Sequence, residues 1–137
     1  METQLFNKHI LLIDDDAVSN MINTKIIKKN FNISVSAQTS AKDALNQFKQ
    51  WIENSQGQLP DTIFLDVNMP VMDGWDFLDE FEKFPESVLS GCKVYMLTSS
   101  IDVEDIEKSK RYKTVHEFIS KPLTPEKLKM LSMERGN

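Results

Sequence analysis

An unbroken apolar run, Ile63 to Leu65, ends in the carboxylate of Asp66. A turn-rich stretch with Pro70 and Asp73-Gly74 follows, and apolar residues at helical spacing begin at Trp75. An apolar run without alternation is typical of a parallel strand buried on both faces. Its last residue emerges at the carboxyl edge of the sheet, where open α/β folds place their ligands. Asp66 is therefore a candidate site residue, although by itself it could equally cap the turn by accepting backbone N–H bonds.

The same arrangement recurs along the chain. Strands are predicted at residues 9–13, 32–37, 63–65, 94–97 and 115–119, with the second more exposed than the others. Helices are predicted from Val18 to about Asn30, from Ser40 to about Ile52, from Trp75 to about Phe84, from Val103 to about Lys110, and from Pro125 to Met133. Good N-cap residues, Asp16, Ser40 and Thr124, precede three of these helices. Five strands alternating with five helices predict an α/β fold with a doubly wound parallel sheet and helices on both faces.

Length and composition limit the function classes. At 137 residues the chain is expected to form one domain, over residues 5–134. A formal net charge of −5 with scattered lysines argues against a nucleic-acid-binding surface. Cys92 is the only cysteine, so no intrachain disulfide can form, and we expect a small buried residue in a reducing compartment. No apolar stretch has the length of a membrane span or a signal peptide, so a cytoplasmic domain without a membrane partner is expected.

Chemically useful groups follow four of the five predicted strands: Asp14 with Asp15, Asp66, Thr98 and Lys121. In a parallel sheet these groups converge at one edge. Two carboxylates 4 Å apart repel by roughly 4 kcal/mol at an effective dielectric near 20. Lys121 offsets part of this repulsion, and Mg²⁺, which favours a few carboxylates with waters and phosphate oxygens, would offset more. Such a set suits phosphoryl transfer, with Asp66 as a nucleophile that forms an aspartyl phosphate.

Four fragments carry a resemblance to a known family: Ile-Leu-Leu-Ile-Asp14-Asp15, Phe-Leu-Asp66-Val-Asn-Met-Pro70-Val-Met-Asp-Gly74, Met-Leu-Thr98-Ser-Ser and Phe118-Ile-Ser-Lys121-Pro122-Leu. In this order and spacing they resemble the receiver domain of a two-component response regulator over essentially the whole chain. The resemblance implies a flavodoxin-like (βα)5 fold. It also implies that Asp66 accepts a phosphoryl group from a sensor histidine kinase or a histidine phosphotransfer protein.

The resemblance assigns further roles by position. It implies that Asp14, Asp15, Asp66 and the backbone carbonyl of Asn68 bind Mg²⁺, that Thr98 is the switch hydroxyl, that Lys121 binds the phosphoryl group, and that Phe118 is the rotating aromatic residue. Such a protein is a phosphoacceptor and not an enzyme. At most it would show Mg²⁺-dependent self-phosphorylation from small phosphodonors and slow autodephosphorylation.

Phosphorylation would act as a switch. A phosphoryl group adds nearly two negative charges. Thr98 would move to bond one of its oxygens, and Phe118 would enter the space that Thr98 leaves. This would reshape the face formed by residues 103–110, 115–119 and the last helix, where an unknown downstream protein target would dock. The sequence is equally compatible with Phe118 as an ordinary core aromatic, and with a monomer or a phosphorylation-dependent dimer. No output domain is expected, so the chain would be a stand-alone receiver or a fragment of a longer regulator.

Two stretches depart from the family pattern: the loop at residues 54–60 is long, and the segment at residues 111–114 lacks the usual Gly-Ala. Other classes are also open. A haloacid-dehalogenase-type phosphatase would need a second acid where this chain has Asn68, and a nucleotide-binding domain would need a glycine-rich loop after the first strand. A receiver scaffold that no longer accepts phosphate would not need the intact acidic set. Trp51, Trp75 and the methionines at helical spacing are expected in the core.

Overall fold

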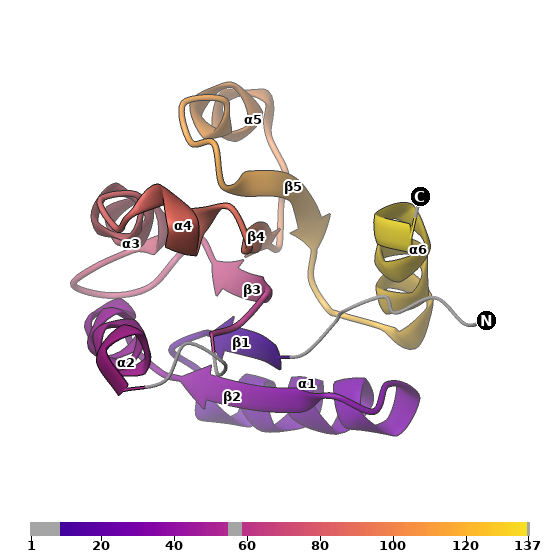
Figure 1. The fold of residues 1–137 in the computed structure, drawn as a ribbon. Helices are drawn as coiled ribbons and strands as arrows, with labels where there is room; N and C mark the ends of the chain where they lie inside the picture. Colours follow the sequence, from indigo (N-terminus) through magenta and orange to yellow (C-terminus); the bar gives the residue numbers. More distant parts are fainter. Residues whose placement is uncertain (1–8, 55–58, 137) are drawn as a thin grey trace.

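The computed structural model describes residues 9–54 and 59–136, which form a five-stranded parallel sheet flanked by helices (Figure 1). The strands are β1 (His9–Ile13), β2 (Ser34–Gln38), β3 (Thr62–Asp66), β4 (Lys93–Thr98) and β5 (Val115–Ser120), and their order in the sheet is β2-β1-β3-β4-β5. The helices are α1 (Ala17–Asn30), α2 (Ala41–Asn54), α3 (Gly74–Phe81), α4 (Glu86–Leu89), α5 (Val103–Ser109) and α6 (Pro125–Gly136). The predicted doubly wound parallel fold is confirmed. The first residues of the expected domain, 5–8, and much of the long loop lie outside the described residues.

Each face of the sheet packs against its own helices. Along β1, Leu11 and Ile13 point into a core shared with α2 and α3, whereas Ile10 and Leu12 point into a core shared with α1 and α6. All four side chains are at most 1% exposed. Because successive side chains on a strand point to opposite faces, a strand covered on both sides has no polar position. This is the physical reason for the unbroken apolar runs, and Figure 1 shows the helices on the two sides of the sheet.

Three helix starts follow the predicted caps. The Asp16 carboxylate accepts from Val18 N over 2.9 Å at the start of α1. Ser40 Oγ accepts from Asp43 N over 3.0 Å before α2, and Thr124 Oγ1 accepts from Lys127 N over 3.1 Å before α6. In each helix the side-chain oxygen satisfies an N–H that has no carbonyl partner within the helix.

The connection between β3 and β4 differs from the prediction of one helix followed by a loop. The first helix, α3, ends at Phe81 instead of near Phe84, and a four-residue helix, α4, follows Pro85. Proline disfavours helical backbone in the residue before it, so α3 cannot run into it. Leu89, 3% exposed, anchors α4 in the core. A single helical turn is too short to show an apolar period, so the sequence pattern could not reveal it.

The apolar spacing in α1 does not mark its buried face. Val18 and Ile22 are 56% and 51% exposed, although they belong to the predicted apolar repeat with Ile26. Asn20 and Ile27, at 5% and 0%, are buried instead. The helix therefore presents apolar side chains to solvent and a polar side chain to the interior.

The expectation of a core position is correct for the tryptophans but not for all methionines. Trp75 is buried, and Trp51 packs against the same core. Met21 and Met130 are 53% and 63% exposed, so the prediction is wrong for these two. Within the described residues, no helix combines the length and the apolar character needed to cross a membrane.

Candidate functional site

The carboxyl ends of β1 and β3 bring three acids together. Asp14 directly follows β1, Asp15 comes next, and Asp66 is the last residue of the adjacent strand β3. One carboxylate oxygen from each acid lies within 4.8 Å of the other two. Asp14 and Asp66 are 3% and 4% exposed, whereas Asp15 is open to solvent. The structure thus places these acids side by side, with one of them at the surface.

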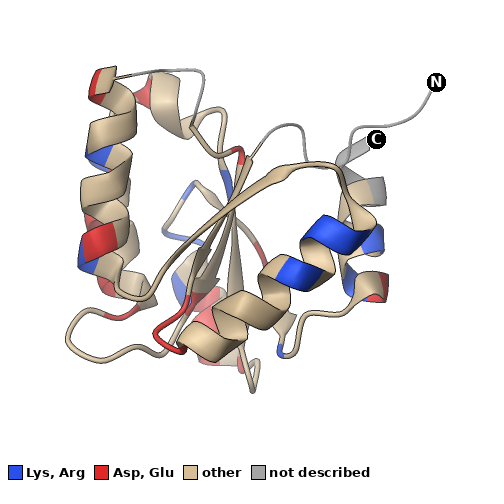
Figure 2. Cartoon of the chain, turned by 90° about the horizontal axis from the view of Figure 1, so that it is seen from below, with Lys and Arg blue, Asp and Glu red and all other residues tan. Residues whose placement is uncertain are grey.

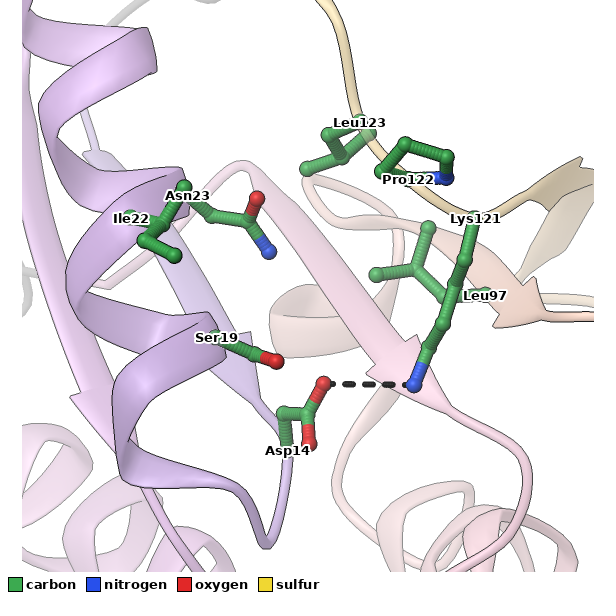
Figure 3. Close-up of a pocket in the computed structure, with 8 residues that line it drawn as sticks. All are labelled: Asp14, Ser19, Ile22, Asn23, Leu97, Lys121, Pro122 and Leu123. Carbon is green, nitrogen blue, oxygen red and sulfur yellow. Dashed lines mark hydrogen bonds and ion pairs between the residues drawn. The ribbon is translucent and has the colours of Figure 1, made fainter.

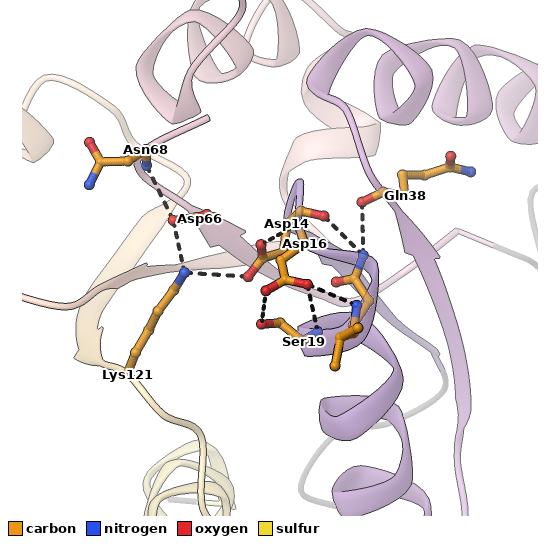
Figure 4. A network of polar contacts seen from close by, with 9 residues as sticks. Asp14, Asp16, Ser19, Gln38, Asp66, Asn68 and Lys121 are labelled. Atoms are coloured by element: carbon orange, nitrogen blue, oxygen red, sulfur yellow. Dashed lines mark hydrogen bonds and ion pairs between the residues drawn. The ribbon is translucent and has the colours of Figure 1, made fainter. Parts of the chain in front are cut away.

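Lys121 lies between two of these carboxylates, directly after β5. Its Nζ is 3.3 Å from Asp66 Oδ1 and 3.4 Å from Asp14 Oδ2 (Figure 4). Burial lowers the pKa of Lys121, but the charges of Asp66 and Asp14 and its hydrogen bonds to them raise that pKa more, so the net shift is upward. The side chain is therefore a cation at neutral pH, held beside the acids.

Asp66 retains uncompensated negative charge. Burial raises its pKa by disfavouring the charged form, and the nearby charge of Asp14 raises it further. Lys121 and the backbone N–H of Asn68, which donates to Asp66 Oδ1 over 3.2 Å, oppose these effects without cancelling them. A carboxylate with a raised pKa is more basic than an ordinary aspartate, and it gains more from a neighbouring cation.

The donor set fits a hard divalent cation. Three carboxylate oxygens within 4.8 Å of one another can share one ion, and Asp15 is exposed, so the cluster is open to solvent on one side. Mg²⁺ prefers oxygen ligands and keeps several waters. Asp14, Asp15 and Asp66 are the residues that would hold it.

The turn that carries the acids is fixed by hydrogen bonds that no sequence pattern revealed. Asp14 Oδ1 accepts from Asp16 N over 2.9 Å. Asn20, in the second turn of α1, donates through Nδ2 to the Asp14 carbonyl over 3.0 Å and to the Gln38 carbonyl over 3.3 Å. Asn20 thereby joins the ends of β1 and β2 to α1. Figure 4 shows Asp14 and Gln38, whose carbonyls accept these bonds, and Lys121 on the other side of Asp14. The Oδ1 atom of Asn20 is buried without a hydrogen-bond partner among the described residues.

Charge is distributed unevenly along α1. The acidic turn leads into its first residue, and Lys28 and Lys29 lie in its last turn. Figure 2 shows red ribbon in the turn before α1 and blue ribbon on its second half. Backbone N–H groups of Ser19 and Val18 lower the pKa of Asp16. Both placements complement the helix dipole and stabilise the helix that starts at the site.

Thr98 and Phe118 lie on neighbouring strands but outside the acidic cluster. Thr98 is 3% exposed at the end of β4, and its hydroxyl donates to the Ser100 carbonyl over 3.1 Å and accepts from Ser100 N over 3.2 Å. Phe118 on β5 is half-buried, with its ring centroid 6.2 Å from that of Trp75. Asn68 is exposed beside Asp66, so the ligand role expected for its carbonyl stays a prediction.

Gly74 brings α3 against the backbone of the central acid. A Cβ atom at this position would lie 2.9 Å from the Asp66 carbonyl oxygen and 3.0 Å from Val67 Cα. The Gly74 N–H donates to the Val67 carbonyl over 3.0 Å. Only glycine fits such a close approach, so the Asp73-Gly74 turn fixes the end of β3 as well as the start of α3.

A cavity of about 330 Å³ opens next to the site, between α1 and the segment after β5. Figure 3 shows its lining, with Asp14 and Lys121 at one end and Ile22, Pro122 and Leu123 on its walls. It thus connects the charged cluster with the exposed side chain of Ile22 on α1.

Comparisons with known proteins agree with this geometry. The sequence model of the response regulator receiver domain matches residues 10–131. The chain belongs to this family. A two-component response regulator from Cytophaga hutchinsonii has 32% identical residues and a TM-score of 0.83, over 93% of this chain and 95% of that structure. Receiver domains act in two-component signalling as phosphoacceptors and are not classical enzymes.

Two sequence relatives illustrate the contexts in which receiver domains occur. The chemotaxis protein CheY of Halobacterium salinarum is 26% identical over 102 residues, which are 74% of this chain and 75% of that protein. The hybrid signal transduction histidine kinase L of Dictyostelium discoideum is 27% identical over 128 residues. Those residues are 93% of this chain but only 7% of the kinase.

Proposed function

We propose that this receiver domain accepts a phosphoryl group on Asp66 in a two-component phosphorelay. The observation that carries the proposal is the meeting of Asp14, Asp15 and Asp66 within 4.8 Å, with the Lys121 ammonium between two of them. The donor is a sensor histidine kinase or a histidine phosphotransfer protein. In the transfer, an Asp66 carboxylate oxygen forms a bond to phosphorus while the bond from phosphorus to the donor histidine nitrogen breaks. The electron pair of that bond stays on the imidazole.

The side chains divide the work of this transfer. Asp66 attacks as the carboxylate, so it needs no general base. Its Oδ1 accepts from Asn68 N and contacts Lys121, and we assign the attack to Oδ2, which has no donor among the described residues. Lys121 neutralises charge on the phosphoryl oxygens. A Mg²⁺ ion held by Asp14, Asp15, Asp66 and the Asn68 carbonyl would supply further neutralisation of that charge.

The phosphodonor protein would dock over the start of α1. Val18, Met21 and Ile22 are more than half exposed there, and Ile22 lines the cavity that ends at Asp14 and Lys121. An exposed apolar patch beside a reactive group is typical of a protein-binding surface. A phosphohistidine side chain of the donor protein would reach Asp66 from this side.

Phosphorylation would then switch a second face. We propose that Thr98 turns from Ser100 towards a phosphoryl oxygen and that Phe118 moves inward. Phe118 lines a cavity of about 540 Å³ together with Ile101 and Ile106, which are 42% and 40% exposed. This face, made of α5, β5 and α6, would bind a downstream protein target. After phosphorylation the chain would either stay a monomer or form a phosphorylation-dependent dimer.

Further parts of the proposal concern the domain and its location. We place the receiver domain at residues 5–134 and in the cytoplasm, where a lone cysteine stays reduced. Catalysis by the chain itself would be limited to Mg²⁺-dependent self-phosphorylation from small phosphodonors and slow autodephosphorylation.

Intact mass spectrometry after incubation with acetyl phosphate tests the proposal. The parent should gain one phosphoryl group in the presence of Mg²⁺ and none in the presence of a chelator. Asp66→Asn should gain none, whereas Asp43→Asn, the same change at an exposed position in α2, should behave as the parent. A parent that gains no phosphoryl group, or an Asp66→Asn variant that still gains one, would contradict it.

A further inference from the structure

Lys127, in the first turn of α6, reaches back to the segment that carries Lys121. Its Nζ donates to the Ser120 carbonyl over 2.7 Å, to the Pro122 carbonyl over 2.9 Å and to the Ser120 hydroxyl over 3.3 Å. An ammonium group has three N–H donors, and all three find an oxygen in this one turn. The two carbonyls belong to the residues on either side of Lys121.

The backbone around Lys121 is therefore fixed at several points. The Lys121 N–H donates to the Thr98 carbonyl over 2.8 Å, which ties it to the end of β4. Lys127 itself is held by its own N–H, which donates to Thr124 Oγ1 over 3.1 Å, and by its neighbour Leu128, which is fully buried. The first turn of α6 is thus well fixed, and from it the Lys127 side chain holds the backbone of residues 120–122 in place.

Side-chain contacts alone hold the Lys121 ammonium loosely. Its distances of 3.3 Å to Asp66 and 3.4 Å to Asp14 exceed the roughly 2.7–2.9 Å of a close hydrogen bond between charged groups. The position of the ammonium therefore depends on the backbone from which its side chain extends. A shift of that backbone would move the ammonium away from an incoming phosphoryl group.

We propose that Lys127 is a positioning residue for phosphoryl transfer, because it holds the turn that presents Lys121 to the phosphoryl group. The inference rests on the proposed function of Asp66. It assigns to α6 a role at the site that is separate from the role of its outer face. Lys127 does not touch the reacting atoms and acts only through Lys121.

A positioning role differs measurably from a purely structural one. Pro122 is exposed, and Ser120 and Lys127 are partly exposed, so water can replace the ammonium at both carbonyls. Loss of Lys127 should then change the stability of the fold little, while the turn gains freedom. The acids that would bind Mg²⁺ lie at the carboxyl ends of β1 and β3 and do not contact Lys127, so its loss should not weaken metal affinity either.

The test compares Lys127→Met with Lys129→Met, which removes the same charge from an exposed position on the same helix. Phosphorylation by acetyl phosphate is followed by intact mass at increasing donor concentration, Mg²⁺ affinity by isothermal titration calorimetry, and stability by urea unfolding. We expect Lys127→Met to lower the maximal rate about tenfold, a typical effect of losing a group that orients a site residue. Mg²⁺ affinity and the free energy of unfolding should not fall below the parent values. Lys129→Met should match the parent in phosphorylation rate, Mg²⁺ affinity and stability. Lys127→Arg should recover part of the rate, because it restores donors to the same carbonyls.

The outcomes separate this inference from the proposed function. A parent without any phosphoryl adduct would overturn both. A parent that is phosphorylated at the same rate as Lys127→Met would overturn only the positioning role. An equal loss of rate, Mg²⁺ affinity and stability in Lys127→Met would also overturn it, since this pattern indicates general structural damage.

Discussion

Asp66→Asn should stabilise the fold at pH 7 when no divalent cation is present. Three carboxylates within 4.8 Å repel by about 3.5 kcal/mol or more per pair at an effective dielectric of 20. The attraction between the Lys121 ammonium and Asp66, which are 3.3 Å apart, is about 5 kcal/mol at the same dielectric. The repulsion from Asp14 and the attraction to Lys121 largely offset each other, and the cost of burying the carboxylate, which is the largest cause of its raised pKa, leaves the charge of Asp66 unfavourable in the folded chain.

The expected gain in stability is modest, because solvent screens part of each electrostatic interaction. Asp15 is exposed and the Lys121 side chain is 33% exposed, so both the repulsion and the attraction are weakened. The amide oxygen of the variant can still accept from Asn68 N, so that hydrogen bond is kept. We expect Asp66→Asn to raise the free energy of unfolding by about 1–2 kcal/mol. Urea unfolding followed by circular dichroism, with a chelator present, measures the difference, and Asp43→Asn serves as the control.

The gain should depend on pH in a defined direction. The pKa of Asp66 is raised above its ordinary value of 3.8 in the folded chain, so ionisation of this group is less favourable in the folded than in the unfolded state. The penalty is present at neutral pH, decreases as the pH falls through the raised pKa, and is gone below 3.8. The two proteins should therefore differ most near pH 7 and least in acid.

Mg²⁺ should reverse the ranking of the two proteins. An ion bound only to the folded parent at 100 times its dissociation constant adds about 2.7 kcal/mol, whereas Asp66→Asn lacks one of the ligands. A variant that is less stable than the parent in chelator, or a stability difference unchanged by Mg²⁺, would refute the account of Asp66 as an uncompensated charge in a cation site.

Two further substitutions test the surroundings of the site by urea unfolding. Gly74→Ala should lower stability by about 1–3 kcal/mol, because the new Cβ would lie 2.9 Å from the Asp66 carbonyl oxygen. Gly91→Ala, with nothing within 4 Å of its Cβ, should stay within about 0.5 kcal/mol of the parent, and equal effects at the two glycines would refute the close approach. Glu82→Ala should cost about 1–3 kcal/mol, because the Glu82 carboxylate accepts from both the N–H and the hydroxyl of Thr114, which is only 6% exposed. A cost below about 0.5 kcal/mol would mean that water reaches these groups.

The elements that the sequence predicted well are those set by local rules. Buried strands need apolar residues on both faces, so the apolar runs around Ile10 and Ile63 were sufficient to predict β1 and β3. Caps such as Asp16 act within three residues, so local sequence was sufficient to locate the start of α1. Convergence of Asp14 and Asp66 followed from parallel topology alone.

The elements that were missed depend on tertiary contacts. Asn20 faces inward because two strand ends offer carbonyls to its amide, and nothing in the helix sequence encodes those partners. The spacing of Val18 and Ile22 predicted a buried face of α1, yet both side chains are exposed next to the acidic cluster. Lys127 resembles any lysine near the start of a helix until the turn beside it is seen. The four-residue helix α4 has no period to detect.

The central claim concerns the identity of the phosphoacceptor, and reductive mapping tests it most directly. Borohydride converts an aspartyl phosphate to homoserine, and tandem mass spectrometry then locates the converted residue. After phosphorylation with acetyl phosphate and Mg²⁺, the account predicts homoserine at position 66 and unchanged residues at Asp14 and Asp15. Homoserine at another position, or none in protein that carries a phosphoryl adduct, would contradict it.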